Sequence, residues 1–518
     1  MNSTLPKNYS YNNLDFWVDE SIWGHRLYDE QTPWLCFMEF LGVLNSEYQN
    51  GSAFVEDTFN SLSYRPYSRI YLRNLLFNNP YIDVIYRDYE NHKDEKKAWN
   101  EWILEAERKF AGIDSIPDFS YLKSNFDSNF EDFYESIKFL QSNTIEGENN
   151  KRWSSQFIFP YGKECLYEDL RIDGDKVQND RRFFGRTGEV LYLMLSRSRR
   201  GENLLPFLET NILNSSSVFN RLAKKLQPDA GLENPVKELK GTYLPYEKLE
   251  DFENLADDWL NIFGCEIPAY DKLPHLVNMT GLHMILYFLN RSKAVLNQDE
   301  KAKFILEIMA PKKTVIRELA SDSFVNNNNL SRQAIELHIY SLKDSIEWKK
   351  IFNCGDPIFE AKKILQEKFM WPSNDEDLTM YNSPDDLLNE LVNKALFRHK
   401  QHVNNFHRVW GKEIGLSSSR NSQRIRYAPT DNFFKSLVIT NVPKRMEFQD
   451  FLAKLYGKYG FIIGDKQAID ITASGQADLI AFSENALRLE QRLSSMGLVR
   501  RLSDAYAYVE NPFAKEGY

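Results

Sequence analysis

Basic and amide side chains recur at helical spacing near the end of the chain, where they could contact nucleic acid. Arg488, Gln491 and Arg492 fall on one face of a predicted helix. Arginine and glutamine can bind guanine and adenine edges through paired hydrogen bonds, and flanking arginines can bind phosphates. Arg500 and Arg501 follow the helix and are candidates for phosphate contact. The pattern therefore predicts a recognition helix; a solvated helix face and a protein-docking surface are the alternatives.

The residues around these side chains predict a winged helix-turn-helix-like domain over residues 446–513. Apolar residues at helical spacing indicate a first helix that ends at Gly460. Gly497 suits the position after the last helix, where the backbone needs a positive φ. Alternating residues with a turn at Ser503 and Asp504 then predict a two-stranded wing. The predicted helices cover residues 448–459, 477–483 and 484–496, and the predicted wing covers residues 498–509.

A basic segment, residues 398–445, precedes this domain in an otherwise acidic chain. It holds ten Lys and Arg against two acidic residues, although the whole chain carries a net charge of −10. Its Ser- and Asn-rich part contains Arg420, Arg424 and Arg426, which we expect to contact phosphates from a mobile linker. The alternative is a solvated loop that covers the acidic body.

Three closely spaced histidines in the same segment raise the question of a metal site. Only His399 and His402 share a helical face, His407 lies further along, and no acidic or cysteine residue is adjacent. Basic neighbours also disfavour a cation. We therefore expect no metal and no cofactor, and we expect these histidines to lie at the surface or to face phosphates.

The four cysteines are far apart in the sequence and contain no CxxC pair. This spacing favours neither a zinc site nor a disulfide scaffold, so we expect buried free thiols in a reducing compartment. The first residues lack the pattern of a signal peptide, and no apolar run reaches the length of a membrane span. These features predict a cytoplasmic protein.

Motifs for nucleotide hydrolysis, serine or cysteine nucleophiles and zinc proteases are missing from the sequence. The chain is therefore expected not to be an enzyme. Asp173, Asp175 and Glu189 near Lys176 leave a divergent metal-dependent nuclease as an alternative. A transcriptional regulator is a further alternative, although some 400 residues before the predicted domain exceed what a simple repressor needs.

The length and composition predict a mainly α, multi-domain (α+β) protein: a helical body with the winged-helix-like domain at its end. With 518 residues, two to four domains are expected, and the scarcity of Gly and Pro argues against an all-β architecture. An Asn run at 326–329 is expected to form a loop between helices. The predicted domains are residues 1–145, 153–397 and 446–513, with the basic linker at 398–445.

Three segments resemble the accessory, non-helicase proteins of bacterial anti-phage defence islands, above all the Druantia protein B type. They read HRLYDEQTPWLCFMEFLGVL (25–44), FFGRTGEVLYLMLSRS (183–198) and RLEQRLSSMGLVRRLSDAYAYVENPF (488–513). The resemblance implies a non-catalytic component of a multi-protein antiviral defence system. It implies partners from the same operon, including a large helicase-like protein. The basic residues described above add DNA as a further candidate partner. None of the segments is a catalytic motif, so no functional residue follows from the resemblance.

Overall fold

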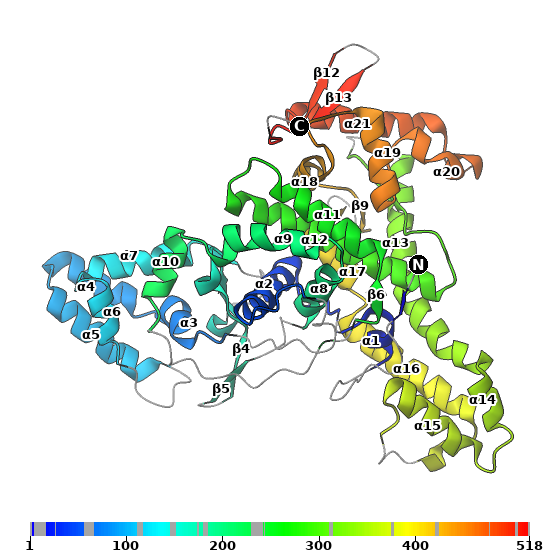
Figure 1. Ribbon diagram of the computed structural model, residues 1–518, viewed down its shortest axis with the longest axis horizontal. Helices are drawn as coiled ribbons and strands as arrows, with labels where there is room; N and C mark the ends of the chain where they lie inside the picture. Colours follow the sequence, from blue (N-terminus) through cyan, green and yellow to red (C-terminus); the bar gives the residue numbers. More distant parts are fainter. Residues whose placement is uncertain are drawn as a thin grey trace. The chain divides into compact units, whose positions relative to one another are not determined.

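The computed structural model of the chain is mainly helical, with short strands between the helices (Figure 1). This confirms the predicted mainly α fold class. No described helix combines the length and apolarity needed to cross a bilayer. The structure describes residues 3–4, 17–25, 27–55, 67–110, 118–145, 152–173, 176–179, 185–228, 242, 244–309, 314–373, 378–419, 424–475, 477–502 and 506–515.

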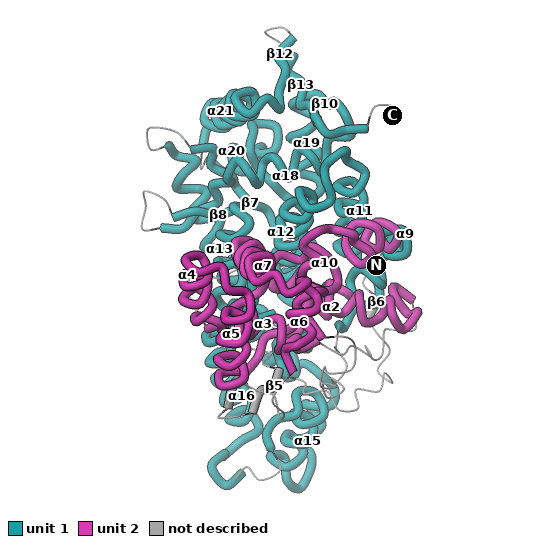
Figure 2. Tube along the Cα trace, turned by 90° about the vertical axis from the view of Figure 1, so that its left-hand side faces the viewer, with its two compact units in different colours: residues 1–33, 193–204, 242–518 teal, residues 34–192, 205–241 magenta. Residues whose placement is uncertain are grey.

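The chain forms two compact units, which Figure 2 shows in different colours. The first unit comprises residues 1–33, 193–204 and 242–518, and the second comprises residues 34–192 and 205–241. The chain therefore leaves the first unit and returns to it. The predicted domains, in contrast, are consecutive ranges of sequence.

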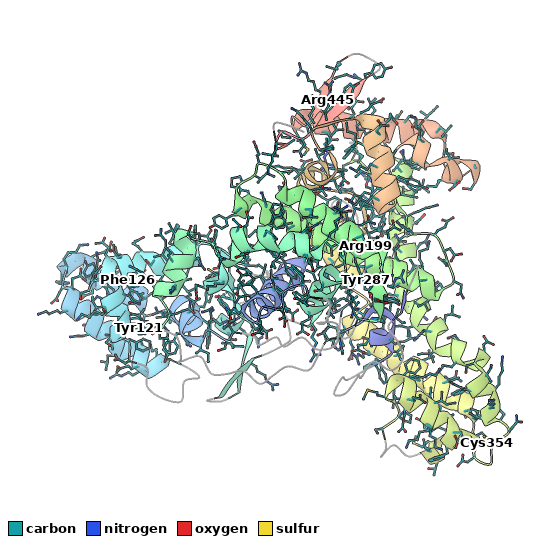
Figure 3. All side chains as sticks on the ribbon, in the orientation of Figure 1. Tyr121, Phe126, Arg199, Tyr287, Cys354 and Arg445 are labelled. Atoms are coloured by element: carbon teal, nitrogen blue, oxygen red, sulfur yellow. The ribbon has the colours of Figure 1, made fainter. Side chains whose placement is uncertain are left out.

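An aromatic core holds the helices of the second unit together. Trp99 and Trp102, one turn apart on α5, both pack on Phe133 of α7, with ring centroids 4.9 and 4.8 Å apart. Figure 3 labels Tyr121 and Phe126 in the same group of helices. The elements of this unit are α2 (Pro33–Gln49), α3 (Ile70–Phe77), α4 (Ile82–His92), α5 (Glu95–Lys109), α6 (Ser120–Asn125), α7 (Phe130–Gln141), β2 (Thr144–Ile145), β3 (Phe157–Ile158), β4 (Leu170–Asp173), β5 (Lys176–Asn179) and α10 (Val218–Lys225); α8 (Thr187–Ser196) and α9 (Gly201–Leu208) include residues of both units.

Helix α12 (Ala269–Val295) is the centre of the first unit. Its residues from Met279 to Ser292 are buried on all sides, as expected for a helix that is apolar around its circumference. Tyr287, labelled in Figure 3, donates a hydrogen bond to the Trp23 carbonyl at 2.9 Å. The other elements before the C-terminal region are β1 (Ser3–Thr4), α1 (Val18–Trp23), β6 (Tyr246–Lys248), α11 (Glu250–Phe263), β7 (Phe304–Ile305), α13 (Val315–Tyr340), α14 (Ile346–Ile351), α15 (Pro357–Phe369), α16 (Pro384–His402), α17 (Phe406–Glu413), β8 (Ser417–Ser418) and β9 (Arg426–Tyr427).

The C-terminal region, residues 430–511, combines helices with a three-stranded antiparallel sheet, at the red end of the chain in Figure 1. The strand order is β10–β13–β12, so the first strand pairs with the last. Arg445, labelled in Figure 3, lies opposite Glu510 at the edge of this sheet. The elements are α18 (Asp431–Asn441), β10 (Arg445–Glu447), α19 (Phe448–Tyr459), β11 (Phe461–Ile462), α20 (Ile469–Ala473), α21 (Leu479–Ser495), β12 (Val499–Arg501) and β13 (Ala507–Glu510).

Buried polar contacts join the C-terminal region to the rest of the first unit. Asp258 on α11 accepts hydrogen bonds from Tyr459 of α19 at 2.8 Å and pairs with Lys458 and with His283 of α12. Strand β11 pairs in parallel with β7. A buried carboxylate is stabilised only when its partners satisfy it, and here three side chains from two helices do so.

The Asn run at 326–329 does not form a loop; α13 continues through it. Asn327 explains why, because its buried amide donates hydrogen bonds to the Lys303 carbonyl and to the Tyr427 hydroxyl, at 3.0 and 2.9 Å. Asparagine disfavours a helix interior mainly because it competes for local backbone groups, and these tertiary partners remove that competition.

The described part of the predicted basic linker, residues 398–445, is folded. It contains the end of α16, all of α17 and α18, and the β8–β9 pair. Phe406, Trp410 and Phe433 are buried. Their apolar side chains, which sit between the basic residues, account for the folded structure.

Candidate interaction surface on helix α21

Helix α21 is a single helix from Leu479 to Ser495, where the sequence predicts two. The Asp478 side chain begins it by accepting a hydrogen bond from the Ala481 backbone N–H at 2.8 Å. Gly497 follows it with φ 72°, as predicted for the helix end. The predicted first helix, residues 448–459, and the cap at Gly460 are confirmed by α19.

One face of α21 is buried and fixes the helix in place. Phe482, Ala486, Leu489 and Leu493 lie on this face. Among them sits Asn485, whose amide donates to the carbonyls of Leu306 and Ile463, both at 2.9 Å. Asn485 is not among the predicted contact residues, because a single asparagine in the sequence does not indicate which distant backbone groups it will bond.

The outer face of α21 carries apolar side chains in its first half. Ile480 is 68% exposed and Leu487 is 43% exposed, with Glu484 between them at 58%. Gln491 continues the same stripe and is exposed. Spacings of three and four residues place these four side chains on one helix face. The predicted break before Glu484 separates Ile480 from Leu487, although their seven-residue spacing places both on one face of a continuous helix.

The predicted contact residues of α21 differ in their surroundings. Arg488 pairs with Glu484 one turn earlier, at 2.8 Å. Arg492 is only 18% exposed: its guanidinium pairs with Asp431 at 2.5 Å and donates to the Pro429 carbonyl at 3.0 Å. Arg492 therefore holds α21 against the start of α18, which is a structural role that its position on the helix did not indicate.

The two arginines of the wing lie on β12, and both are exposed. Arg501 pairs with Glu490 of α21 at 3.2 Å. Arg500 lies opposite Tyr508 and makes no ion pair within the described part of the chain. The predicted two-stranded hairpin is thus confirmed, and its predicted turn at Ser503 and Asp504 lies outside the described residues.

The three arginines predicted in the basic segment do not form one phosphate-binding group. Arg420 lies outside the described residues. Arg424 is exposed, and it interacts with other groups of the protein. Arg426 is only 2% exposed, because it pairs with Glu307, which also pairs with Arg317 at 2.7 Å. The prediction that Arg426 contacts phosphate is therefore wrong for this fold.

Two of the three histidines are buried, against the prediction that they lie at the surface or face phosphates. His399 hydrogen-bonds the Ser331 hydroxyl, and His407 hydrogen-bonds the Tyr427 hydroxyl, both at 2.9 Å. Burial lowers the pKa of His399 to about 4 and that of His407 to about 3. Neutral imidazoles in polar pairs are the result, and their role is to satisfy buried hydroxyl groups.

The remaining chemical expectations concern metals and thiols. Among the described residues, no group of three or more His, Cys, Asp or Glu side chains is placed to hold a metal ion. Asp175 of the nuclease alternative lies outside the described residues. The cysteines are free, and three of them are buried, but Cys354, labelled in Figure 3, is exposed.

The chain was compared with protein-family models, curated protein sequences and solved structures, and it matches none of them.

Proposed function

We propose that the C-terminal region is a winged helix-turn-helix module that binds a partner protein through α21. The order α18, β10, α19, α21, β12, β13, with the first strand paired to the last, supports this assignment. In a winged helix the three helices and three strands follow in this order, and the last helix is presented outward. The inserted elements β11 and α20 lie between the second and third of these helices.

The observation that carries the choice of a protein partner is the outer face of α21. In a helix-turn-helix protein the first half of the recognition helix meets the bases. Here that half presents Ile480, Glu484 and Leu487, and a carboxylate and two apolar groups disfavour a phosphate-lined groove. Burying an exposed Ile or Leu side chain in an interface is favourable by about 1.5–3 kcal/mol.

Charges near this face indicate the chemistry of the partner. Asp478, two positions before Ile480 at the start of α21, is exposed. Glu484, one turn after Ile480, is 58% exposed and pairs with Arg488. The two carboxylates flank Ile480 along the helix. A complementary partner surface would offer an apolar anchor flanked by Lys or Arg, because opposite charges at the rim of an interface favour association.

We further propose that the chain is a non-catalytic component of a bacterial antiviral defence system. The three segments that resemble defence-island accessory proteins support this role, and the third of them, residues 488–513, covers the second half of α21 and the whole predicted wing. On this proposal the partner of α21 is one of the proteins encoded in the same operon, and the large helicase-like protein is one of these candidates.

The test uses the full chain and the purified proteins encoded beside its gene. Ile480→Asp combined with Leu487→Asp should weaken binding of one such protein by about 100-fold, as expected for two interface anchors. Calorimetry measures the affinity, and plating phage on cells that carry the operon measures protection. Both should fall together.

Val325→Asp is the matched control, because Val325 is a half-exposed apolar residue on another helix of the same unit. It should leave binding and protection unchanged. If the two α21 substitutions leave the affinity for every operon protein unchanged, the proposed docking role is wrong.

Nucleic acid is a second candidate partner, and the exposed arginines of the wing favour it. Arg500 is exposed without an ion pair to described residues, and Arg445 lies on the same sheet. Each phosphate contact that is lost should lower the slope of log affinity against log salt concentration by about one. Fluorescence anisotropy measures the affinity of the wild type and of the double variant Arg500→Ala, Arg501→Ala for duplex and single-stranded DNA over a range of salt concentrations. If the affinity of the wild type does not depend on salt, DNA is excluded as the partner.

A further inference from the structure

A cavity of about 620 Å³ lies within the first unit, and α21 supplies none of its lining residues. Its walls come from the first turns of α12, the end of α17, the start of α18 and Phe513. This volume is in the range of pockets that hold small molecules. Eight of its fourteen lining residues are polar or charged and the others are apolar or glycine, which points to a ligand that has charged or hydroxyl groups beside a less polar part.

Two lysines supply positive charge to the cavity. Lys412 comes from the end of α17, and Lys435 comes from α18, where its ammonium lies 5.3 Å from the centre of the Phe513 ring. Neither lysine makes an ion pair with a residue that the structure describes. The carboxylates of Asp271 and Glu413 also line the cavity, and the ammonium groups are nevertheless not engaged by them.

A hydrogen-bond network fixes the polar wall between α12 and α18. The Ser436 hydroxyl donates to the Asn432 carbonyl at 3.0 Å, and its oxygen is 2.8 Å from Nδ1 of His275 and 3.0 Å from Nδ2 of Asn278. Because the Ser436 proton is used, Nδ1 of His275 is the donor in its pair. The other ring nitrogen, Nε2, is then a hydrogen-bond acceptor. Burial lowers the pKa of His275 to about 4, which keeps the ring neutral near pH 7.

The backbone around the cavity is closely held. The Thr430 N–H donates to the Gly415 carbonyl at 2.8 Å, and the Thr430 hydroxyl accepts from the Phe433 N–H to begin α18. Gly415 has φ 77°, and a side chain there would collide with Thr430. On the other wall, the Phe513 carbonyl accepts a hydrogen bond from the Glu266 N–H at 2.7 Å. A pocket with such fixed walls loses little conformational entropy on binding.

We propose that this cavity binds a small molecule that carries a phosphate group and hydroxyl groups, such as a sugar phosphate or a nucleotide. Lys412 and Lys435 bind the phosphate, since an ammonium donates charge-assisted hydrogen bonds to phosphate oxygens. Nε2 of His275 accepts a hydrogen bond from a ligand hydroxyl, and Asp271 and Glu413 offer further acceptors for hydroxyl groups. This inference is independent of the docking role of α21.

Calorimetric titration of the full chain with ribose 5-phosphate and with adenosine 5′-monophosphate tests the proposal. At least one of the two should bind saturably, and ribose and adenosine should bind about tenfold more weakly or not at all. Preference for the adenosine compound identifies a nucleotide site, and equal or reversed affinity identifies a sugar phosphate site. Saturable binding of neither compound would overturn the proposal.

Charge-removing variants locate the site. Lys412→Gln and Lys435→Gln should each weaken the phosphorylated ligand by about tenfold, the loss of one charge-assisted contact. Lys400→Gln, on the exposed side of α16, is the matched control and should bind as the wild type does. If all three variants weaken ligand binding equally, the ligand is attracted by the positive charge of the protein in general and not by this cavity, which would also overturn the proposal. The unfolding temperature of each variant confirms that it is folded.

Discussion

The segment from His399 to Arg426 and the segment from Glu484 to Arg501 are both rich in basic residues, but among the residues that the structure describes only the first segment has basic side chains that are buried. In the first, His399, His407 and Arg426 are buried. In the second, Arg500 and Arg501 are exposed. The difference depends on distant partners: Glu307 reaches Arg426 across 119 positions of sequence. A run of positive charge therefore does not by itself indicate which residues face a ligand.

The largest expected effect in this comparison comes from Arg426. Arg426→Leu removes one partner of the buried Glu307 carboxylate and leaves it with Arg317, so we expect a loss of about 3–5 kcal/mol in the free energy of unfolding. Urea unfolding measures it. Arg500→Leu is the control and should change stability by less than about 0.5 kcal/mol. Equal stability of the two variants would show that the burial of Arg426 is energetically unimportant.

A smaller effect should come from the buried histidines as the pH falls. The pKa of His407 is about 3 in the folded chain, below its unfolded value, so the unfolded chain binds more protons in the interval between them. Stability is therefore lost as the pH falls below about 6.5, by on the order of 1–2 kcal/mol for this histidine at pH 5. Urea unfolding at pH 7.5, 6 and 5 measures the slope.

His407→Gln should reduce the difference in stability between pH 7.5 and pH 5. His92→Gln is the control, because His92 is exposed on α4, and it should keep the wild-type slope. A slope that is the same in all three proteins would contradict a buried neutral His407.

The smallest expected effects concern the arginines of α21. Arg492→Ala breaks a pair whose partner, Asp431, is 62% exposed, so we expect a loss of about 0.5–1 kcal/mol that shrinks at high salt. Arg488→Ala removes a pair one turn apart on the same helix and should cost about 0.3–0.5 kcal/mol. Thermal unfolding at low and high salt measures both. If Arg488→Ala costs more than Arg492→Ala, Arg492 does not hold α21 against α18.

Local patterns in the sequence predict the C-terminal elements well. The apolar stripe of α19, the glycine at 497 and the alternation in the wing are all short-range signals, and the structure confirms each of them. Strand β10 was not predicted, because three residues that pair with β13 some sixty positions later carry no local pattern.

The candidate site is less predictable than the elements, for the same physical reason. The position of Arg492 on its helix was predicted, but its partner Asp431 belongs to another helix. The exposure of Ile480 depends on which face of α21 the rest of the unit covers. Similarly, the cavity beside His275 is made by segments far apart in the sequence, and no motif within one segment announces it.

The contacts that hold α21 limit how the C-terminal region can be transferred between proteins by recombination. Asn485 accepts a hydrogen bond from the Ile308 N–H and donates to the Leu306 carbonyl, and β11 pairs with β7 at residues 304–305. A gene fragment that begins at α18 would encode a chain that lacks all of these partners. Recombination could therefore not transfer the C-terminal region to another protein as a separate domain; it would have to carry residues 304–308 along.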